Sequence, residues 1–383
     1  MSRFAPYLGI VAALALGALL AVFSGGPSVS YAPERPAESA SSTLSVLPGL
    51  ILPPLSLPNL RPPEETEASA PAQPAPAPKK SSPPPASPAP AAPTAVSIPI
   101  LPSFSGGNEA LDEVAPVLRA ALVNIICYVP AGSGLHSISG SGVFVDSKGI
   151  ILTNAHIAQY FLLLGRKVSC TVRAGSPAID RYEAALIYIP TAWLEENAEV
   201  LTQENPIGTG ERDFAFLAVT RSATNEALSG SFPAIPLATT PPGTGTPVVI
   251  ATYGAQFLES SQVQSFLFPT IVFGSVKDVF TFAVNTIDVL ALGGSAAAQE
   301  GSSGGGVAGA SGELVGTITT STVEGTTDTR SLDAITASYI RAAYANETGE
   351  ALDLLLAKPT AAAVADFAPK LPALEALITA QLP

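Results

Sequence analysis

Short apolar runs separated by turn residues dominate the chain from about residue 110 onward. Glycine, proline and asparagine punctuate these runs, which include "LVNIICYV", "SGVFV", "GIILT", "SCTVRA", "AALIYI", "DFAFLAV", "PVVIATYG", "TIVFGSV" and "ELVGTIT". Many short strands with frequent turn signals are typical of a β-sandwich or a β-barrel. The pattern therefore predicts a folded unit that is mostly β.

The N-terminal segment instead carries one long apolar run. After Met-Ser-Arg the chain reads "FAPYLGIVAALALGALLAVFSGG", an uncharged stretch close to the ~20 residues that a helix needs to cross a bilayer. We interpret residues 1–31 as a retained transmembrane anchor, because Phe23 fits poorly in a small-x-small cleavage site; a cleaved signal peptide is the alternative. Arg3 would hold this end in the cytoplasm, so the rest of the chain would lie outside.

Residues 32–104 show neither helical nor alternating periodicity. Proline, alanine and serine dominate the centre of this segment, "ETEASAPAQPAPAPKKSSPPPASPAPAAPTA", in a chain with 37 prolines. Such tracts cannot bury a core and favour extended polyproline II conformations. We expect a disordered linker that holds the folded unit away from the membrane.

The overall composition excludes several classes of partner and cofactor. A formal net charge of −13 without a basic stripe argues against phosphate-backbone binding, so no nucleic-acid partner is expected. With only two cysteines and two histidines, we predict no metal site and no other cofactor. The sequence does not indicate an oligomeric state.

The two cysteines are candidates for a disulfide. Export would allow Cys127 and Cys170 to pair, because oxidised cysteines persist outside the cytoplasm. Closing a loop of that length would stabilise the fold by roughly 4 kcal/mol. The alternative is two separate buried thiols.

Three segments carry the residue types needed for nucleophilic catalysis. The Gly-dense run "QEGSSGGGVAG" contains Ser303, "TNAHI" contains His156, and "ERDFAFLAV" contains Asp213. A serine hydroxyl attacks efficiently only when an imidazole accepts its proton, and a carboxylate fixes the tautomer of that imidazole. These three segments therefore supply a candidate catalytic triad.

The order of the three residues along the chain discriminates between folds. Residues 301–305 also fit the G-x-S-x-G pattern of α/β-hydrolases, but that fold needs a histidine after the serine, and none follows Ser303. A subtilisin-type order needs an aspartate before the histidine, and Asp146 lies only ten residues upstream of His156 in the turn-like sequence "DSKG". The remaining order is His, Asp, Ser.

The same segments resemble a known family. The runs "GSGVFVDSKGIILTNAHI", "DFAFLAV" and "GSSGGGVAGASGELVGTIT" are similar to the three motif blocks of chymotrypsin-like (trypsin-like) serine proteases, nearest to the bacterial HtrA type. The resemblance covers roughly residues 112–345 and indicates a protease domain over 105–345. It implies two six-stranded antiparallel β-barrels with the active site between them.

The resemblance also implies a role for each candidate residue. His156 would act as general base and then acid, Asp213 would orient it, and Ser303 would attack the scissile carbonyl to form an acyl-enzyme. The backbone N–H groups of Gly301 and Ser303 would form the oxyanion hole. Loss of one such donor typically lowers kcat by about 10²–10³.

Substrate-binding residues follow from the same comparison of motifs. Ala297, six residues before the nucleophile, would lie at the base of the primary pocket. Without an acid there, a Lys or Arg side chain would be buried unpaired, so we expect cleavage after small or medium aliphatic residues. Thr319, Thr320 and Ser321 would pair with the substrate backbone as an added strand.

Two positions depart from the family pattern. Zymogen-type members place an aspartate before the nucleophile, where it pairs with a newly cut N-terminus, whereas this chain has Ser302. Activation by N-terminal insertion is therefore not expected. Gly306 stands where Pro or Ala is common, which predicts a more flexible loop that substrate binding would order.

Residues 346–383 follow the family-like region and leave no room for the PDZ domain that HtrA-type proteins usually carry. Leucine and alanine spacing predicts two short helices split around Pro359 and Pro372. Before them, "LDAITASYIRAAYANETG" predicts a helix that ends at Gly349. We expect this tail to cover the second barrel; the alternative is a partner-binding module.

The features together predict a membrane-anchored, extracytoplasmic serine endopeptidase that acts on polypeptides. A different class of function remains open, namely a catalytically silent protease-like domain that binds polypeptides or cell-envelope partners. A serine esterase on the same barrels is a third, weaker alternative.

Overall fold

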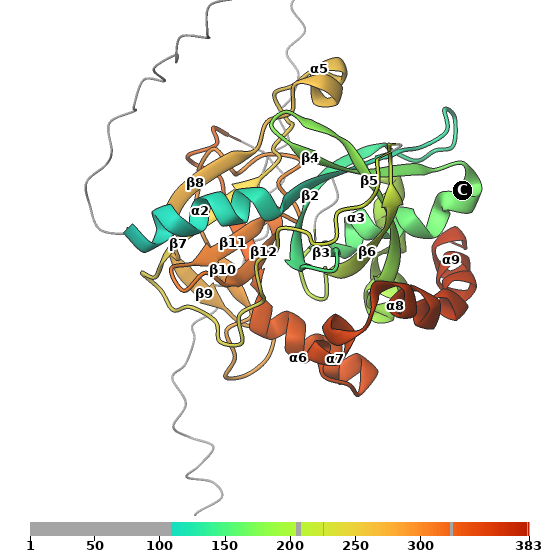
Figure 1. Ribbon diagram of the computed structural model, residues 1–383. Coiled ribbons are helices and arrows are strands. Elements are labelled where there is room, and N and C mark those ends of the chain that lie inside the picture. Colours follow the sequence, from blue (N-terminus) through green and yellow to red (C-terminus); the bar gives the residue numbers. More distant parts are fainter. Residues whose placement is uncertain (1–108, 204–207, 225, 322–324, 381, 383) are drawn as a thin grey trace, which may run out of the picture. The chain divides into compact units, whose positions relative to one another are not determined.

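The computed structural model describes residues 109–203, 208–224, 226–321, 325–380 and 382 (Figure 1). The predicted anchor and linker, residues 1–31 and 32–104, lie outside the described residues. In the part of the chain that the structure describes, none of the helices has both the length and the apolar character needed to span a bilayer.

Six antiparallel strands form a closed barrel in the N-terminal half of the described chain. They run in the order β1-β2-β3-β6-β5-β4, and pairing of β4 with β1 closes the barrel. Their bounds are β1 (Leu122–Tyr128), β2 (Ile138–Asp146), β3 (Ile150–Thr153), β4 (Ser169–Gly175), β5 (Ala178–Tyr188) and β6 (Ala215–Ser222). The predicted mostly-β architecture and its first six-stranded barrel are confirmed.

A seven-stranded antiparallel sheet follows and curls into a half-barrel. Its order is β8-β7-β11-β12-β13-β10-β9. The strands are β7 (Pro247–Thr252), β8 (Thr270–Ser275), β9 (Asp278–Phe280), β10 (Val289–Ala291), β11 (Gly306–Gly309), β12 (Leu314–Ser321) and β13 (Leu332–Thr336). A second closed, six-stranded barrel was therefore a wrong prediction.

The opening lies between the two edge strands, β8 and β9, which are joined by only two residues. The N–H of Val276 donates to the carbonyl of Thr246, beside β7, whereas the N–H of Lys277 donates to Ala291 on β10. The two linking residues thus bond to opposite neighbours. The chain turns sharply between β8 and β9. Among the described residues, no backbone hydrogen-bond ladder joins these two strands.

Cys127 and Cys170 are joined by a disulfide bond that spans the pair of strands closing the first barrel. The two cysteines lie directly opposite each other on β1 and β4. The sequence separation of 43 residues means that the bond ties together strands formed far apart in the chain.

Helix α2 (Glu109–Ala121) leads into β1 and lies across both β units (Figure 1). It contacts β2 of the barrel and β7, β8 and β11 of the half-barrel. Its buried residues recur every three or four positions, as expected of an amphipathic helix: Leu111, Val114, Leu118 and Ala121. The other helical segments before the C-terminal region are α3 (Ala155–Ala158), η1 (Gln159–Arg166), α4 (Thr191–Asn197), η2 (Ala198–Thr202) and α5 (Ser260–Ser265).

Helix α6 (Ala337–Thr348) follows β13 directly and has a cap at each end. The Thr336 hydroxyl accepts a hydrogen bond from the N–H of Tyr339, and Gly349 ends the helix at φ +75° with its N–H bonded to the carbonyl of Ala345. The predicted end of this helix at Gly349 is confirmed.

The C-terminal tail forms three α-helices, not two: α7 (Leu352–Ala357), α8 (Thr360–Phe367) and, after the turn η3 (Ala368–Lys370), α9 (Leu371–Thr379). Pro359 precedes α8 as predicted, whereas Pro372 lies in the first turn of α9, where its missing N–H is tolerated.

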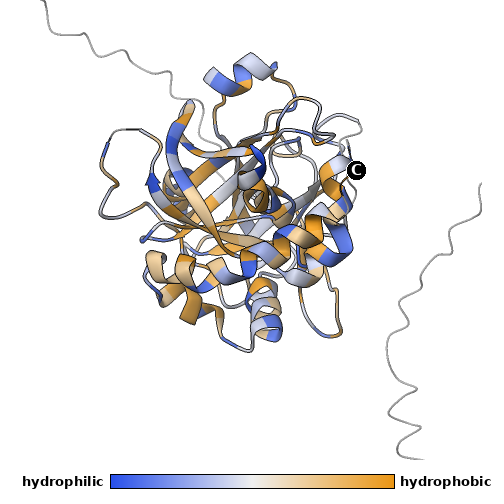
Figure 2. Ribbon diagram, turned by 90° about the vertical axis from the view of Figure 1, so that its right-hand side faces the viewer, coloured by the Kyte–Doolittle hydropathy of each residue, from blue (hydrophilic) through white to orange (hydrophobic). Residues whose placement is uncertain are grey.

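Helices α8 and α9 pack on the first barrel, so the predicted position of the tail on the second barrel was wrong for these two helices. Helix α8 contacts β5 and β6, and α9 contacts α4, η1 and η2. Buried Phe367 and Ile378 provide apolar contacts, and Arg166 pairs with Glu375 at 3.0 Å. Figure 2 views the molecule from the right-hand side of Figure 1, and the helices on this side combine hydrophobic and hydrophilic residues. This is expected of helices that pack one face on a barrel and expose the other to solvent.

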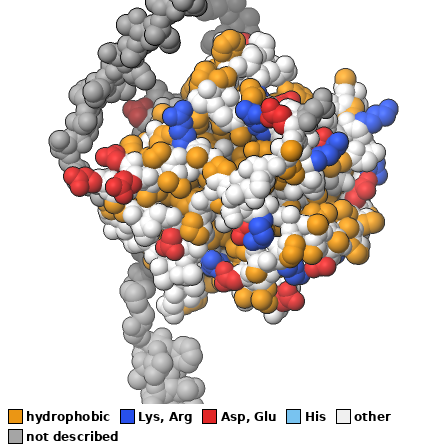
Figure 3. Space-filling view, in the orientation of Figure 1, with side chains coloured by type: hydrophobic (Ala, Val, Ile, Leu, Met, Phe, Trp, Pro, Cys, Tyr) orange, Lys and Arg blue, Asp and Glu red, His pale blue; other side chains and the backbone are white. Residues whose placement is uncertain are grey.

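On the face shown in Figure 3, acidic and basic side chains are interspersed among apolar and neutral ones.

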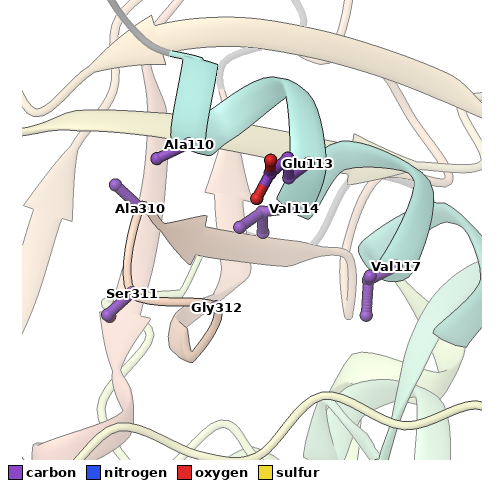
Figure 4. Close-up of a pocket in the computed structure, with 7 residues that line it drawn as sticks. All are labelled: Ala110, Glu113, Val114, Val117, Ala310, Ser311 and Gly312. Carbon is purple, nitrogen blue, oxygen red and sulfur yellow. The ribbon is translucent and has the colours of Figure 1, made fainter.

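A pocket of about 290 Å³ opens between α2 and the β11–β12 turn, with Val114, Val117 and Ser311 among its lining residues (Figure 4). It contains none of the predicted site residues, so it is separate from the candidate active site.

Candidate active site

His156 lies in the short helix α3, immediately after β3 and the helix-capping residue Asn154. All four residues of β3 are buried, which fixes the strand end and therefore the start of the helix. The side chain of Gln159 donates to the carbonyl of His156 at 3.0 Å. His156 itself retains 17% side-chain exposure, so its ring can be reached from solvent.

Asp213 is positioned beside His156 by the pairing of β3 with β6. Thr153, at the end of β3, lies opposite Ala215 at the start of β6, and Asp213 precedes that strand by two residues. The Asn154 side-chain amide donates to the backbone carbonyl of Asp213 at 2.7 Å. The side chain at the N-cap position of the histidine helix thus holds the backbone of the aspartate and does not bond to the helix itself.

The Asp213 carboxylate accepts three hydrogen bonds. Oδ2 lies 2.8 Å from Nδ1 of His156 and accepts the Thr319 hydroxyl at 2.8 Å, while Oδ1 accepts the His156 backbone N–H at 3.0 Å. Burial by itself would raise the pKa of Asp213, but the His156 charge and these hydrogen bonds outweigh it and lower the pKa below its usual value. The carboxylate is therefore ionised at neutral pH and accepts the proton on Nδ1, which leaves Nε2 as the basic nitrogen.

Ser303 lies in the glycine-rich loop between β10 and β11. The N–H of Ser302 donates to the carbonyl of Gln299 and closes a turn whose third residue, Gly301, has φ +90°. Only glycine adopts this conformation without strain. A Cβ at Gly301 would also come within 2.7 Å of the Tyr253 carbonyl oxygen, so the loop needs glycine for space as well as for conformation.

The loop is bonded to the first barrel next to the histidine helix. The N–H of Ser141, on β2, donates to the carbonyl of Ser303 at 2.7 Å. A Cβ at the neighbouring Gly140 would overlap the side chain of Ile157 and approach the Ser303 carbonyl oxygen to 3.5 Å. Ile157 directly follows His156, so the nucleophile loop and the histidine helix meet at Gly140.

His156 and Ser303 are not hydrogen-bonded to each other in the described structure, although the helix of His156 and the loop of Ser303 meet at Gly140. Within the described part of the chain, the His156 ring bonds only through Nδ1, and the Ser303 hydroxyl has no hydrogen-bond partner. Catalytic hydrogen bonds are often long before substrate binds, so the free Nε2 and Oγ atoms remain compatible with proton transfer.

The two peptide groups of the predicted oxyanion hole are held by their carbonyl oxygens. Glu300 O accepts the N–H of Ala255 at 2.8 Å, and Ser302 O accepts the N–H of Gly305 at 2.9 Å. In a trans peptide the C=O and N–H groups point in opposite directions. The hydrogen bonds to these carbonyls therefore direct the N–H groups of Gly301 and Ser303 away from Ala255 and Gly305, respectively. Neither N–H donates to any residue that the structure describes.

The predicted substrate-binding residues occupy two places. Ala297 is fully buried in the segment before the nucleophile loop. Thr319, Thr320 and Ser321 form the end of β12, which the sheet leaves open on one edge: pairing with β11 reaches only Thr317, whereas β13 continues alongside. An extended peptide could add to this open edge as a further strand.

Several residues that support the site were not predicted from the sequence. Asn154 and Ser141 could have been suspected from their places in "TNAHI" and "GSG", because polar residues in otherwise apolar or glycine-rich runs need buried partners. Thr319 was predicted only as a substrate contact, but its hydroxyl also binds Asp213. Buried Arg330 donates to Ala298 and Gln256, and no local sequence signal indicated this role.

Comparison with known proteins assigns this arrangement to a family. Residues 140–316 match the family model described as the trypsin-like peptidase domain. These residues form a trypsin-like peptidase domain. The match spans the segments of all three triad candidates and confirms the trypsin-like resemblance and its class of enzyme, the serine endopeptidases.

Three similar solved structures are described as proteases. The inactive form of Rv3671c protease is 17% identical, with a TM-score of 0.40 and coverage of 65% of this chain and 100% of that one. Its active form from M. tuberculosis is 18% identical, with a TM-score of 0.39 and coverage of 65% and 94%. A serine endoprotease from Yersinia pestis is 21% identical, with a TM-score of 0.38 and coverage of 60% and 63%. No curated protein sequence matches the chain.

Proposed function

We propose that the chain is a membrane-anchored, extracytoplasmic endopeptidase that cleaves peptide bonds through His156, Asp213 and Ser303. The observation that carries this proposal is the pair of hydrogen bonds from His156 to the buried Asp213 carboxylate, 2.8 and 3.0 Å long. They fix both the ring and the backbone of the proposed base. A serine loop docked at the same helix supplies the nucleophile.

The proposed reaction begins when Ser303 Oγ attacks the substrate carbonyl and His156 Nε2 takes the hydroxyl proton. Asp213 stabilises the resulting imidazolium through Nδ1. The negative charge that develops on the substrate oxygen lies between the N–H groups of Gly301 and Ser303. Their fixed orientation means that little reorganisation accompanies the step.

The tetrahedral intermediate then collapses as His156 gives its proton to the leaving amine. An acyl-enzyme remains on Ser303, and the amine product departs. His156 next takes a proton from water as the water oxygen attacks the ester carbonyl. The second tetrahedral intermediate collapses with cleavage of the bond to Ser303 Oγ, which receives the proton from His156, and the peptide acid departs. The second half of the cycle uses the same groups as the first.

Substrate would bind as a strand along residues 319–321 of β12, with its primary side chain directed toward Ala297. The Ala297 side chain is uncharged, and the adjacent Ala298 is also fully buried and apolar. A Lys or Arg side chain would lose its hydration there without gaining an acidic partner. We therefore expect cleavage after small or aliphatic residues.

A peptide library tests this proposal. The full chain in detergent micelles would be incubated with the library, and cleaved bonds would be identified by mass spectrometry, with Ser303→Ala as the control. Cleavage after small aliphatic residues that disappears in Ser303→Ala supports the proposal. Binding of peptides without cleavage would support the catalytically silent alternative.

The membrane anchor is a separate part of the proposal and has a separate test. Mass spectrometry of the mature chain purified from membranes should find the N-terminus at Met1 or Ser2. A mature N-terminus after residue 24 would replace the anchor with a cleaved signal peptide.

A further inference from the structure

Ser141 links the first barrel to two segments of the second sheet. It lies on β2, is fully buried, and belongs to none of the triad or substrate-binding elements. Its N–H donates to Ser303 O at 2.7 Å and its hydroxyl donates to Gly301 O at 2.8 Å. The same hydroxyl accepts the N–H of Tyr253 at 2.9 Å.

The direction of these hydrogen bonds is unambiguous. The Tyr253 N–H can only donate, so the Ser141 oxygen is the acceptor there and its single proton is free for Gly301 O. The Ser141 carbonyl accepts the Thr153 hydroxyl at 2.7 Å, which fixes the backbone that carries the side chain. Every polar atom of Ser141 is thus engaged.

The hydroxyl acts on the peptide between Gly301 and Ser302, which directly follows the peptide that would supply the Gly301 N–H to the oxyanion hole. Hydrogen bonds hold the peptide groups on both sides of Gly301. The Ser141 hydroxyl donates to the Gly301 carbonyl, and the Ala255 N–H donates to the carbonyl of the preceding residue, Glu300. Ala255 is only two residues from Tyr253, whose N–H also bonds to Ser141. One hydroxyl therefore joins the loop to the segment that orients the Gly301 N–H.

Other side chains of the loop do not supply this restraint. The hydroxyl of Ser302, between the two carbonyls that Ser141 binds, is buried without a hydrogen-bond partner in the described residues. Without the Ser141 hydroxyl, the Gly301 carbonyl would be left unpaired, at a cost of about 1–3 kcal/mol if it stayed buried. Rotation of the adjoining peptides would relieve that cost and turn the Gly301 N–H away from the substrate.

We propose that Ser141 is a positioning residue that holds the oxyanion loop in its catalytic conformation. The inference rests on the proposed protease function. It means that a residue of the first barrel stabilises the oxyanion hole built by the second sheet. Formation of the hole then depends on correct docking of the two β units.

The test compares Ser141→Ala with Ser139→Ala in the full chain. Ser139 lies two residues earlier on β2, and its hydroxyl accepts a hydrogen bond from Asn124, not from the loop. We expect Ser141→Ala to lower kcat by about 10- to 100-fold with KM within about twofold, since one oxyanion donor is worth about 10²–10³. Ser139→Ala should retain the native kcat.

A second readout separates the oxyanion hole from the rest of the site. A peptide boronate places a negatively charged tetrahedral oxygen in the hole, whereas the product peptide that carries the new amino terminus does not. Ser141→Ala should weaken boronate binding by the same factor as kcat and leave product binding within about twofold. Equal weakening of both ligands, or an equal effect in Ser139→Ala, would overturn the positioning role.

Failure of the protease function would be recognised first, because the native chain would then cleave nothing. If the native chain cleaves peptides and folded Ser141→Ala retains the native kcat, only the Ser141 inference is overturned. If Ser141→Ala does not fold, Ser141→Cys replaces it, since a thiol fills the site but donates weakly. A lower kcat in Ser141→Cys with normal product binding supports the role, and an unchanged kcat contradicts it.

Discussion

Asp213 binds His156 at two points, the ring Nδ1 at 2.8 Å and the backbone N–H at 3.0 Å. The carboxylate therefore fixes the position of the helix start and the orientation of the imidazole together. Because these bonds come from one residue, loss of the negative charge should disturb proton transfer much more than it disturbs the fold.

Replacing Asp213 with Asn should lower kcat by about 10⁴ at neutral pH, since an amide favours the wrong imidazole tautomer. Steady-state kinetics with a peptide substrate would measure this. Thr319→Val, which removes the third hydrogen bond but keeps the charge, should lower kcat by less than about tenfold. A fall in kcat of less than tenfold in Asp213→Asn would contradict the assigned role.

Replacing Gly301 with Ala should lower kcat by at least about 100-fold, because the added Cβ would displace a peptide of the proposed oxyanion hole. Gly301 has φ +90° and would place that Cβ 2.7 Å from Tyr253 O. Gly312→Ala is the matched control, since Gly312 has φ +78° with no atom within 4 Å of the Cβ position. Gly312→Ala should reduce thermal stability slightly while kcat is retained; equal kcat values for the two variants would refute this prediction.

Replacing Ser302 with Ala should leave kcat within about twofold and raise the free energy of unfolding by up to about 1 kcal/mol. The reason is that the Ser302 hydroxyl is buried without a partner in the described residues, which is unfavourable. Ser302→Asp should instead destabilise the chain, because it would bury a charge with no cation assigned to it. Urea denaturation in a Ser303→Ala background measures both changes, and a destabilised Ser302→Ala would show that the hydroxyl has a partner.

The lowered pKa of Asp213 predicts a pH-dependent contribution to stability. The carboxylate binds protons less readily in the folded state than in the unfolded state, where its pKa is about 3.9. Its contribution is therefore present above about pH 4 and is lost as pH falls through the lower folded value. Comparing Ser303→Ala with Ser303→Ala/Asp213→Asn by urea denaturation should show a stability difference that shrinks below about pH 4; a constant difference would contradict the assigned pKa direction.

Removing the disulfide should affect stability far more than catalysis. The bond joins β1 to β4 across the closure of the first barrel and encloses a 43-residue separation, for which chain-entropy reasoning gives about 4 kcal/mol. The Cys127→Ser/Cys170→Ser variant should therefore unfold at clearly lower urea concentration. Its kcat below the unfolding range should stay within about twofold, and a large kcat loss in folded protein would show coupling to the site.

The sequence was most informative where chemistry depends on residue order. His156, Asp213 and Ser303 could be selected because only one known order of triad residues fits the chain, and the structure brings their three segments together. The short apolar runs likewise predicted strands, since each is bounded by turn residues. Both signals are local or depend only on order along the chain.

Features that depend on tertiary contact could not be predicted in this way. The half-barrel stays open because Val276 and Lys277 bond to opposite neighbours, which no local pattern reveals. Helices α8 and α9 lie on the first barrel because their apolar faces and Glu375 match surfaces formed much earlier in the chain, as the 209-residue separation of Glu375 from Arg166 illustrates. Ser141 and Gly301 are 160 residues apart, so their hydrogen bond becomes visible only in the folded chain.

Covalent labelling of the full chain with a fluorophosphonate tests the central claim most directly. The probe reacts with activated serines, so intact-mass analysis of the native chain, Ser303→Ala and Ser302→Ala compares two adjacent hydroxyls. We predict one label on the native chain and on Ser302→Ala, and none on Ser303→Ala. A folded native chain that takes no label, or a label that persists in Ser303→Ala, would contradict the assignment of Ser303 as the catalytic nucleophile.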